Sequence, residues 1–373
     1  MPSKKRSLLA ASGAGEIEAS LWSVGTDGNG GLGLGNTTAY SSFQQVGALV
    51  DWAMASNYSA SFALKTDGTL WAWGYNGATL GALGLSSATV AFSSPVQVGA
   101  LTDWTVVSAG SGVCNGGIRS NGTAWTWGGG WTGRLGQNDV NHRSSPTQLG
   151  ALTTWVDIGM GNASGCAVKS DGTLWCWGDG GGGRTGQGNT TTISSPSQTS
   201  GAGSWLKITV GSACAGGLKT DGTIWTFGAN GSGQLGLGNT TSYSVPKQVG
   251  ALTTWSKIRM AGTWCIALKT DGTLWGWGAN SNGQLGQGNT TSLSSPTQIG
   301  ALTTWHDFDA GNGQVVAVQT NGTLWSWGYG GQGKLGHGNT TNYSSPKQVG
   351  SYTDWASGST GAHVSFAIKG AIV

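Results

Sequence analysis

The sequence predicts an all-β fold, a seven-bladed β-propeller with about 50 residues per blade. The composition is that of turns and pleated surfaces, because 70 of the 373 residues are Gly, 21 are Trp and only 9% are charged. A string of the form LWxWG occurs seven times, starting at Leu21, Leu70, Ala124, Leu174, Ile224, Leu274 and Leu324. The Trp of the segment ALTTW and its variants also occurs seven times, at Trp52, Trp104, Trp155, Trp205, Trp255, Trp305 and Trp355. Two independent landmarks therefore give the same number of blades.

Each copy is expected to contain four short strands, as the copy from Trp255 to Gly300 illustrates. WSKI opens the first strand, and CIALK, with apolar residues at alternate positions, forms the second. Asp271 and Gly272 form a tight turn, after which TLWGWG is the third strand. The segment ANSNGQLGQGNTTSLSSP is predicted to be a long loop, and PTQIG a short outer strand whose proline belongs at a sheet edge or at a strand start.

The two ends of the chain are expected to complete one blade together. The first copy lacks the first two strands, and the last copy lacks the LWxWG strand. We therefore expect Ser365 to Lys369 to pair beside Ala19 to Gly25, which closes the ring and removes an exposed sheet edge. Residues 1–18 are then an N-terminal extended arm, and residues 19–373 a single propeller.

The tryptophans and cysteines are interpreted as structural. All Trp residues except Trp131 and Trp264 fall at the repeated positions, where large rings pack between sheets. The five cysteines form an odd set without a CxxC pair, so we expect buried free thiols rather than a disulfide framework or a zinc site. They are Cys114, Cys166, Cys176, Cys214 and Cys265.

No catalytic residues, metal site or cofactor are predicted. The GxGxxG strings lie in recurrent loops with no following helix, so the glycines serve loop conformation. The repeated Asp of the DGT turns is replaced by Asn121 and Asn321 in two copies, which indicates a turn role rather than ionisation. The NTT strings, at Asn36, Asn189, Asn239, Asn289 and Asn339, are likewise interpreted as turn caps and not as glycosylation sites.

Charge and hydropathy exclude other classes of partner. A net charge of +3 is too small to attract nucleic acid, and no apolar run is long enough to cross a membrane. The first residues do not form a signal peptide. The expected location is intracellular or within a particle such as a virion, and the sequence does not choose between them.

The repeat unit DGTLWxWGxNxxGQLGxGNTTxxxSPxQV resembles the repeat of the regulator of chromosome condensation family over about residues 18 to 370. The resemblance implies a seven-bladed propeller, and the family includes a nucleotide exchange factor for the GTPase Ran. A His that is common in the family is absent, and no insertion supplies that factor's protruding hairpin. The basic tail is reduced to Lys4, Lys5 and Arg6. Ser164, Cys214, Trp264, Gln314 and Val364 stand at the position of the His.

Strand direction predicts where a partner would bind. The first and third strands of a blade run the same way, so the turns after both emerge on one face and the Asp-Gly turns on the other. The copies differ most on the first face, and repeat proteins place specificity on variable loops, where Trp and Arg are favoured anchors. The alternative is neutral drift of these loops. The candidate partner-binding residues are Trp131, Arg134, His142, Arg143, Arg184, Trp264, Gln314 and Lys334.

The sequence favours a non-enzymatic scaffold for protein–protein interaction or assembly. Low charge and near-identical copies suit a structural component of a phage virion or surface appendage, in which the N-terminal arm docks on a neighbouring subunit. A glycan-binding propeller or adhesin is an alternative, supported by Trp131 and Trp264. Guanine nucleotide exchange on a small GTPase is a less favoured one.

Overall fold

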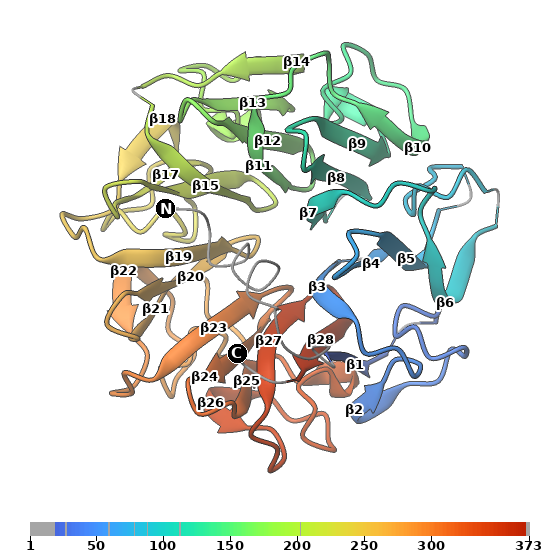
Figure 1. The fold of residues 1–373 in the computed structure, drawn as a ribbon. Helices are drawn as coiled ribbons and strands as arrows, with labels where there is room; N and C mark the ends of the chain where they lie inside the picture. Colours follow the sequence, from blue (N-terminus) through green and yellow to red (C-terminus); the bar gives the residue numbers. More distant parts are fainter. Residues whose placement is uncertain are drawn as a thin grey trace, which may run out of the picture.

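The computed structural model describes residues 19–26, 28–58, 60–77, 79–87, 89–111, 113–201 and 203–370. These residues form seven four-stranded antiparallel sheets arranged as blades around a common axis (Figure 1). The predicted propeller is confirmed, and the predicted arm, residues 1–18, lies outside the described residues. Within the described ranges, no helix has the length and apolar character needed to span a bilayer.

The strands occupy the same four positions in every blade, and each blade is named below by its inner strand. The inner strands are β3 (Trp52–Asn57), β7 (Trp104–Ala109), β11 (Trp155–Met160), β15 (Trp205–Val210), β19 (Trp255–Met260), β23 (Trp305–Ala310) and β27 (Trp355–Thr360). The second strands are β4 (Ala60–Lys65), β8 (Cys114–Arg119), β12 (Ser164–Lys169), β16 (Cys214–Lys219), β20 (Trp264–Lys269), β24 (Gln314–Gln319) and β28 (Val364–Lys369).

The third strands carry the LWxWG string, and the fourth strands form the rim of the disc. The third strands are β1 (Ser20–Gly25), β5 (Leu70–Tyr75), β9 (Ala124–Gly128), β13 (Leu174–Gly178), β17 (Ile224–Gly228), β21 (Leu274–Gly278) and β25 (Leu324–Gly328). The outer strands are β2 (Tyr40–Gln45), β6 (Ala91–Gln97), β10 (Arg143–Gln148), β14 (Ile193–Gln198), β18 (Tyr243–Gln248), β22 (Leu293–Gln298) and β26 (Tyr343–Gln348). Three single 3₁₀ turns are η1 (Trp131–Gly133), η2 (Gly181–Gly183) and η3 (Gly331–Gly333).

The repeated DGTxW string builds a short relay of hydrogen bonds at each hairpin. In the β19 blade, Asp271 Oδ1 accepts from the amide and hydroxyl of Thr273, at 3.0 and 2.7 Å. The Thr273 hydroxyl in turn accepts from the indole of Trp275 at 2.9 Å. Asn321 makes the same contacts with Thr323 at 3.1 and 2.7 Å, so the turn needs an acceptor oxygen rather than a charge. The turn interpretation of these residues is confirmed.

The hydrophobic core lies between neighbouring blades rather than inside any one of them. The second strands are buried along nearly their whole length because both faces of each sheet are covered, as in β20. One cluster joins Ile266 and Leu285 of the β19 blade to Trp305 and Trp327 of the β23 blade. The Trp327 indole also donates to the Gln284 carbonyl at 3.0 Å, which satisfies its only donor. The Trp rings therefore pack between adjacent blades, and some of them, such as Trp327, also form a hydrogen bond to the neighbouring blade.

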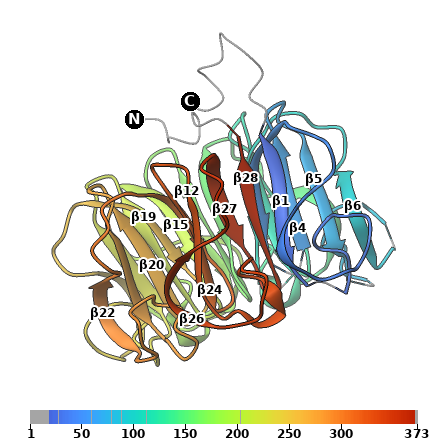
Figure 2. The ribbon, with the colours of Figure 1, turned by 90° about the horizontal axis from the view of Figure 1, so that it is seen from below.

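The ring is closed by strands from opposite ends of the chain. β1 pairs with β28 in antiparallel register from Ser20 opposite Lys369 to Gly25 opposite Val364. The four strands of this blade follow the order β2-β1-β28-β27 (Figures 1 and 2). The predicted pairing of the chain ends is confirmed.

The predicted outer strand differs from the observed one in its bounds. The outer strand of the β19 blade begins at Leu293, three residues before the predicted start, and Pro296 lies at the edge of the sheet as expected. The pairing of this edge strand with its neighbour has a register irregularity between Gly276 and Gly278. Proline has no N–H to donate, and at this place no hydrogen bond of the sheet requires one.

The cysteines also differ from expectation, because Cys166 and Cys176 form a disulfide between β12 and β13. The two residues are direct cross-strand partners whose Cα atoms lie 4.0 Å apart. Register across a hairpin was the missing information. Cys214 and Cys265 remain buried thiols, and burial raises the pKa of Cys214 to about 12.

Candidate partner-binding face

The turns after the inner strands and the loops after the third strands form one end of the disc, here called the long-loop face. In the β19 blade these are residues 261–263 and 279–292, and the antiparallel pairing of β19, β20 and β21 places both at the same end. Figure 2 shows the blades from the side, so that their two ends can be compared. The directions of the strands therefore place these turns and loops on one face, as predicted.

Trp131 is the most prominent aromatic residue of this face. Its side chain is 44% exposed, and it begins the turn η1 in the loop that follows β9. The Arg134 guanidinium lies 4.6 Å from the ring centroid, and the His142 ring meets it edge-on at 4.6 Å. His142 is fixed in turn because its Nδ1 accepts the Gly130 amide at 3.0 Å. Trp131 is therefore an exposed ring held in place from two sides.

Arg143 forms an ion pair within the same loop. Its guanidinium bonds the Asp139 carboxylate at 2.5 Å, and both side chains are partly exposed. Val140, between them in sequence, is 58% exposed. The loop thus presents an exposed Trp and an exposed Val on a frame closed by an ion pair.

Three predicted anchors are buried or partly buried instead of exposed. Arg134, Arg184 and Lys334 occupy the same position in their loops. Arg134 and Lys334 are only 7% and 1% exposed, and the Arg184 side chain is 15% exposed. Each cation reaches a backbone carbonyl on the inner turn of the next blade. Arg134 donates to Asn162, Arg184 to Ser212 at 3.1 Å, and Lys334 to Ala362 at 3.1 Å. In the fold, these hydrogen bonds hold each blade to the next one.

Each of these three cations is covered by a different group. Trp131 covers Arg134, the Asp179 carboxylate lies 3.5 Å from Arg184, and the Tyr329 ring lies 4.8 Å from the Lys334 ammonium. Trp131 and Tyr329 come from positions two residues apart in their loops, yet their rings take equivalent places. A Cβ at Gly331 would lie 2.3 Å from the Tyr329 ring, and a Cβ at Gly129 would lie 2.9 Å from the Trp131 ring.

The surroundings of Lys334 shift the pKa of its ammonium group. Burial lowers its pKa from the usual 10.5 to about 8. Its ammonium donates to the carbonyls of Asn312 at 2.8 Å and Ala362 at 3.1 Å, and no carboxylate pairs with it among the described residues. The two blades with Gln at this position use it differently, because Gln284 accepts the amide of Asn282 within its own loop at 2.8 Å.

Trp264 and Gln314 were expected on the inner turns, but each is the first residue of a second strand. Their side chains are 2% and 0% exposed, so neither presents a surface to a partner. Gln314 instead donates to the Gly361 carbonyl of the next blade at 3.2 Å. The turns are one residue shorter than the sequence suggested, which moves both side chains into the space between blades.

Sequence reasoning missed Tyr329, which is 39% exposed. The signal was present, because only Tyr75 and Tyr329 put an aromatic ring at a place where the other copies carry a small or polar residue. Within the ranges that the structure describes, no group of three or more His, Cys, Asp and Glu residues could hold a metal ion.

Comparisons with known proteins agree with this geometry. Yeast RCC1 (Prp20), in a structure with Kap60, is similar with a TM-score of 0.85 and 18% identity over 100% of this chain and 93% of that chain. Prp20p from Saccharomyces cerevisiae in another structure gives 0.84 and 18% over 100% and 95%. Human WBSCR16 gives 0.84 and 18% over 95% and 100%.

These solved structures share the fold, and a search of curated proteins finds no match to the chain. The sequence profile of the regulator of chromosome condensation (RCC1) repeat, by contrast, matches residues 121–168, 221–268, 271–318 and 321–368. The matched repeats span about half of the chain, and each contains the third and fourth strands of one blade and the first two strands of the next. The chain therefore belongs to the RCC1 repeat family.

Proposed function

We propose that this protein is a non-enzymatic propeller scaffold that binds a protein partner through the long-loop face, with Trp131 as the anchor. The observation that carries the proposal is a large ring, 44% exposed, that Arg134 and His142 hold in one orientation. Interface hot spots are enriched in Trp, and a ring that is already immobile loses little conformational entropy on binding.

The surroundings of Trp131 support an interface that combines an apolar centre with a polar rim. Val140 adds exposed apolar surface from the same loop, and the Arg143–Asp139 pair adds charge beside it. Tyr329 places a second aromatic ring over a buried cation in another blade of the same face. Two such rings on one rigid disc would give a partner two fixed points of contact.

The similar solved structures support a role in protein binding. Prp20p from Saccharomyces cerevisiae is described with binding properties to Gsp1p and histones, and yeast RCC1 (Prp20) was solved bound to Kap60. Our proposal for this chain takes from them only that a propeller of this kind serves as a protein-binding surface.

A finer proposal is that the chain is a structural part of a larger assembly, such as a virion or surface appendage. The low charge of the sequence motivates it. The described chain enters the ring at Ala19, which pairs with Asp51 next to the start of β3 and therefore lies at the end opposite the long loops. Residues 1–18 and the long-loop face would then engage different neighbours.

The test is affinity purification of the intact chain from its native source, compared with the Trp131→Ala variant. The matched control is Leu252→Ala, because Leu252 is also 44% exposed but lies at the opposite end of the disc. We expect recovery of a specific protein to fall at least tenfold for Trp131→Ala and to be unchanged for Leu252→Ala. Equal recovery by Trp131→Ala would contradict the proposal. A small GTPase or a glycan as the captured molecule would favour the corresponding alternative.

Deletion of residues 2–18 tests the assembly proposal separately. Loss of capsid, tail or appendage proteins on this deletion is expected if the arm docks on a neighbour. Their retention would place any assembly contact on the ring itself.

A further inference from the structure

A cavity of about 310 Å³ lies at the centre of the long-loop face, where the inner strands end. Arg259, Met260 and Trp264 of the β19 blade form part of its wall, and residues 310–313 of the β23 blade form another part. Its volume is at the lower end of the range for small-molecule sites. Arg259 is the only charged side chain among its described lining residues.

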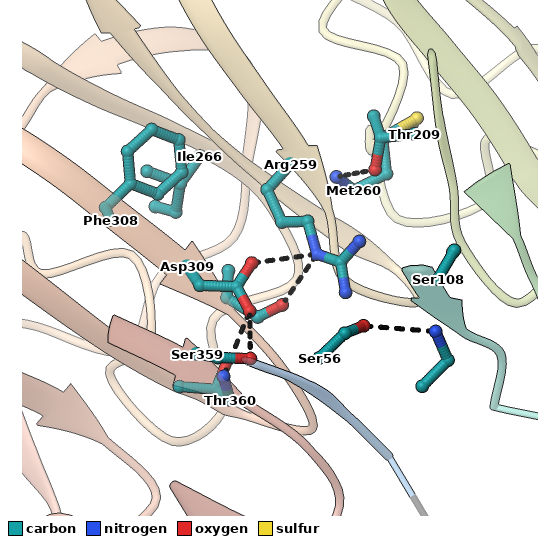
Figure 3. A network of polar contacts seen from close by, with 12 residues as sticks. Ser56, Ser108, Thr209, Arg259, Met260, Ile266, Phe308, Asp309, Ser359 and Thr360 are labelled. Carbon is teal, nitrogen blue, oxygen red and sulfur yellow. Dashed lines mark hydrogen bonds and ion pairs between the residues drawn. The ribbon is translucent and has the colours of Figure 1, made fainter. Parts of the chain in front are cut away.

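Arg259 occupies a position that other blades use for a structural hydroxyl (Figure 3). The Ser108 hydroxyl accepts the Met160 amide of the next blade at 3.0 Å, and the Thr209 hydroxyl accepts the Met260 amide at 3.1 Å. The residues at this fifth place of the inner strands are Ser56, Ser108, Gly159, Thr209, Arg259, Asp309 and Ser359. A guanidinium cannot accept a hydrogen bond, so Arg259 cannot perform this task.

The guanidinium of Arg259 is anchored through one of its three nitrogens. Its Nε lies 3.0 Å from Asp309 Oδ1 and 3.4 Å from the Ala310 carbonyl oxygen. Asp309 is itself held, because its Oδ2 accepts the Thr360 amide at 3.0 Å. No described residue accepts a hydrogen bond from Nη1 or Nη2, and Figure 3 shows both directed away from Asp309. The Arg259 side chain is 27% exposed, so a ligand can reach these two nitrogens.

The shape and charge of this site select the ligand. The two terminal nitrogens form a planar fork that matches the two oxygens of a carboxylate. Because Asp309 already offsets part of the charge of Arg259, a singly charged anion fits better than a doubly charged phosphate. Met160, Val210 and Met260 add apolar surface to part of the lining, where a small hydrocarbon body on that anion can pack.

We propose that this cavity binds a carboxylate carried on a small apolar body, with Arg259 Nη1 and Nη2 donating to its two oxygens. A free carboxylic acid and the C-terminal residue of a peptide present the same chemistry. The proposal does not depend on the partner bound at Trp131, since binding in the cavity is measured without that partner.

Methionine methyl groups provide a direct probe of the cavity. The chain has four methionines, and Met160 and Met260 line the cavity whereas Met54 does not. The intact protein, labelled with ¹³C at its Met methyl groups, is titrated with 4-methylpentanoate and with its neutral amide. A hexapeptide ending in Leu, with a free or an amidated C-terminus, is titrated in parallel.

We expect a carboxylate to shift the Met160 and Met260 signals in a saturable way, to leave Met54 unmoved, and to bind at least tenfold more tightly than the matching amide. Binding of the small acid identifies a free carboxylic acid as sufficient, and binding of the peptide alone identifies a peptide C-terminus. Equal binding of acid and amide would overturn the proposal, as would the absence of saturable shifts with both carboxylates.

Variants that copy residues of neighbouring blades are chosen because we expect them to keep the ring folded. Arg259→Thr with Asp309→Ser reproduces the side chains of Thr209 and Ser359 and is expected to weaken carboxylate binding at least tenfold. The control pair, Lys257→Val with Asp307→Ser, removes another ion pair between the same two blades, outside the lining of the cavity. Its carboxylate affinity should equal that of the unmodified protein. Unchanged binding in the Arg259 variant would overturn the assignment.

Discussion

Replacing the buried Lys334 with Gln is expected to change how the stability of the ring depends on pH. The Lys334 side chain is buried, and burial lowers its pKa from 10.5 to about 8. Between these two values the unfolded chain binds more protons than the folded one. The free energy of unfolding contributed by this lysine therefore rises with pH across that window, and the charged form costs stability below it.

The size of the effect follows from the shift. One pKa unit corresponds to about 1.4 kcal/mol, so the change from 10.5 to about 8 corresponds to about 3 kcal/mol. This is an upper value, because the hydrogen bonds to Asn312 and Ala362 favour the ammonium form. Gln is a suitable replacement since Gln234 and Gln284 stand at the same loop position and accept amides of their own loops at 2.8 Å.

The assay is urea unfolding followed by Trp fluorescence at intervals from pH 7 to pH 11. Relative to the unmodified protein, Lys334→Gln is expected to be more stable at pH 7 than at pH 11 by up to about 3 kcal/mol. Lys247→Gln removes the same charge from an exposed outer strand and serves as the control. If the pH profiles of Lys334→Gln and the unmodified protein are parallel, the buried ammonium does not carry the proposed cost.

Three further predictions concern the stability of the ring. Replacing Cys166 with Gly and Cys176 with Thr, as in the neighbouring blades, should lower the free energy of unfolding by about 2–3 kcal/mol under oxidising conditions, because the disulfide closes a short loop. The same pair should have no such effect in dithiothreitol. In urea unfolding, Trp327→Ala should cost about 3–5 kcal/mol, since its ring is 0% exposed, whereas Trp131→Ala should cost about 1 kcal/mol or less. Deleting residues 364–373 should abolish a single cooperative thermal transition in calorimetry, because β28 joins β1 to β27; an unchanged transition would contradict ring closure as a source of stability.

The loops that carry Arg134, Arg184 and Lys334 have a feature that the sequence did not predict. Arg134, Arg184 and Lys334 vary between copies and carry charge, which on a surface loop is typical of partner contacts. In the folded ring the same side chains reach carbonyls of the next blade, about 28 residues further along the chain. The sequence shows where a residue lies within its own blade, but it does not show how close that residue is to the turn of the next blade.

The cavity residue Arg259 is a second example. All other inner strands except the one with Asp309 carry Ser, Thr or Gly at this place, so the departure was visible in the repeat. Its meaning depends on where the strand ends relative to the axis. The pairing with Asp309 and the open Nη1 and Nη2 become apparent only when seven inner strands converge. A pocket shared by several blades has no signature within one repeat.

Several features could be predicted from the amino-acid sequence alone: the number of blades, the composite blade that closes the ring, the hairpin turns and the Trp residues that pack between sheets. These features are local or repeat at a fixed interval, so hydrophobic alternation and turn chemistry are sufficient to place them. The folded ring was needed to show that Cys166 and Cys176 are bonded, that Trp264 and Gln314 are buried, and that Trp131 is exposed above a buried Arg134. Those outcomes depend on cross-strand register and on contacts between blades, because a side chain is buried by whichever segment folds against it.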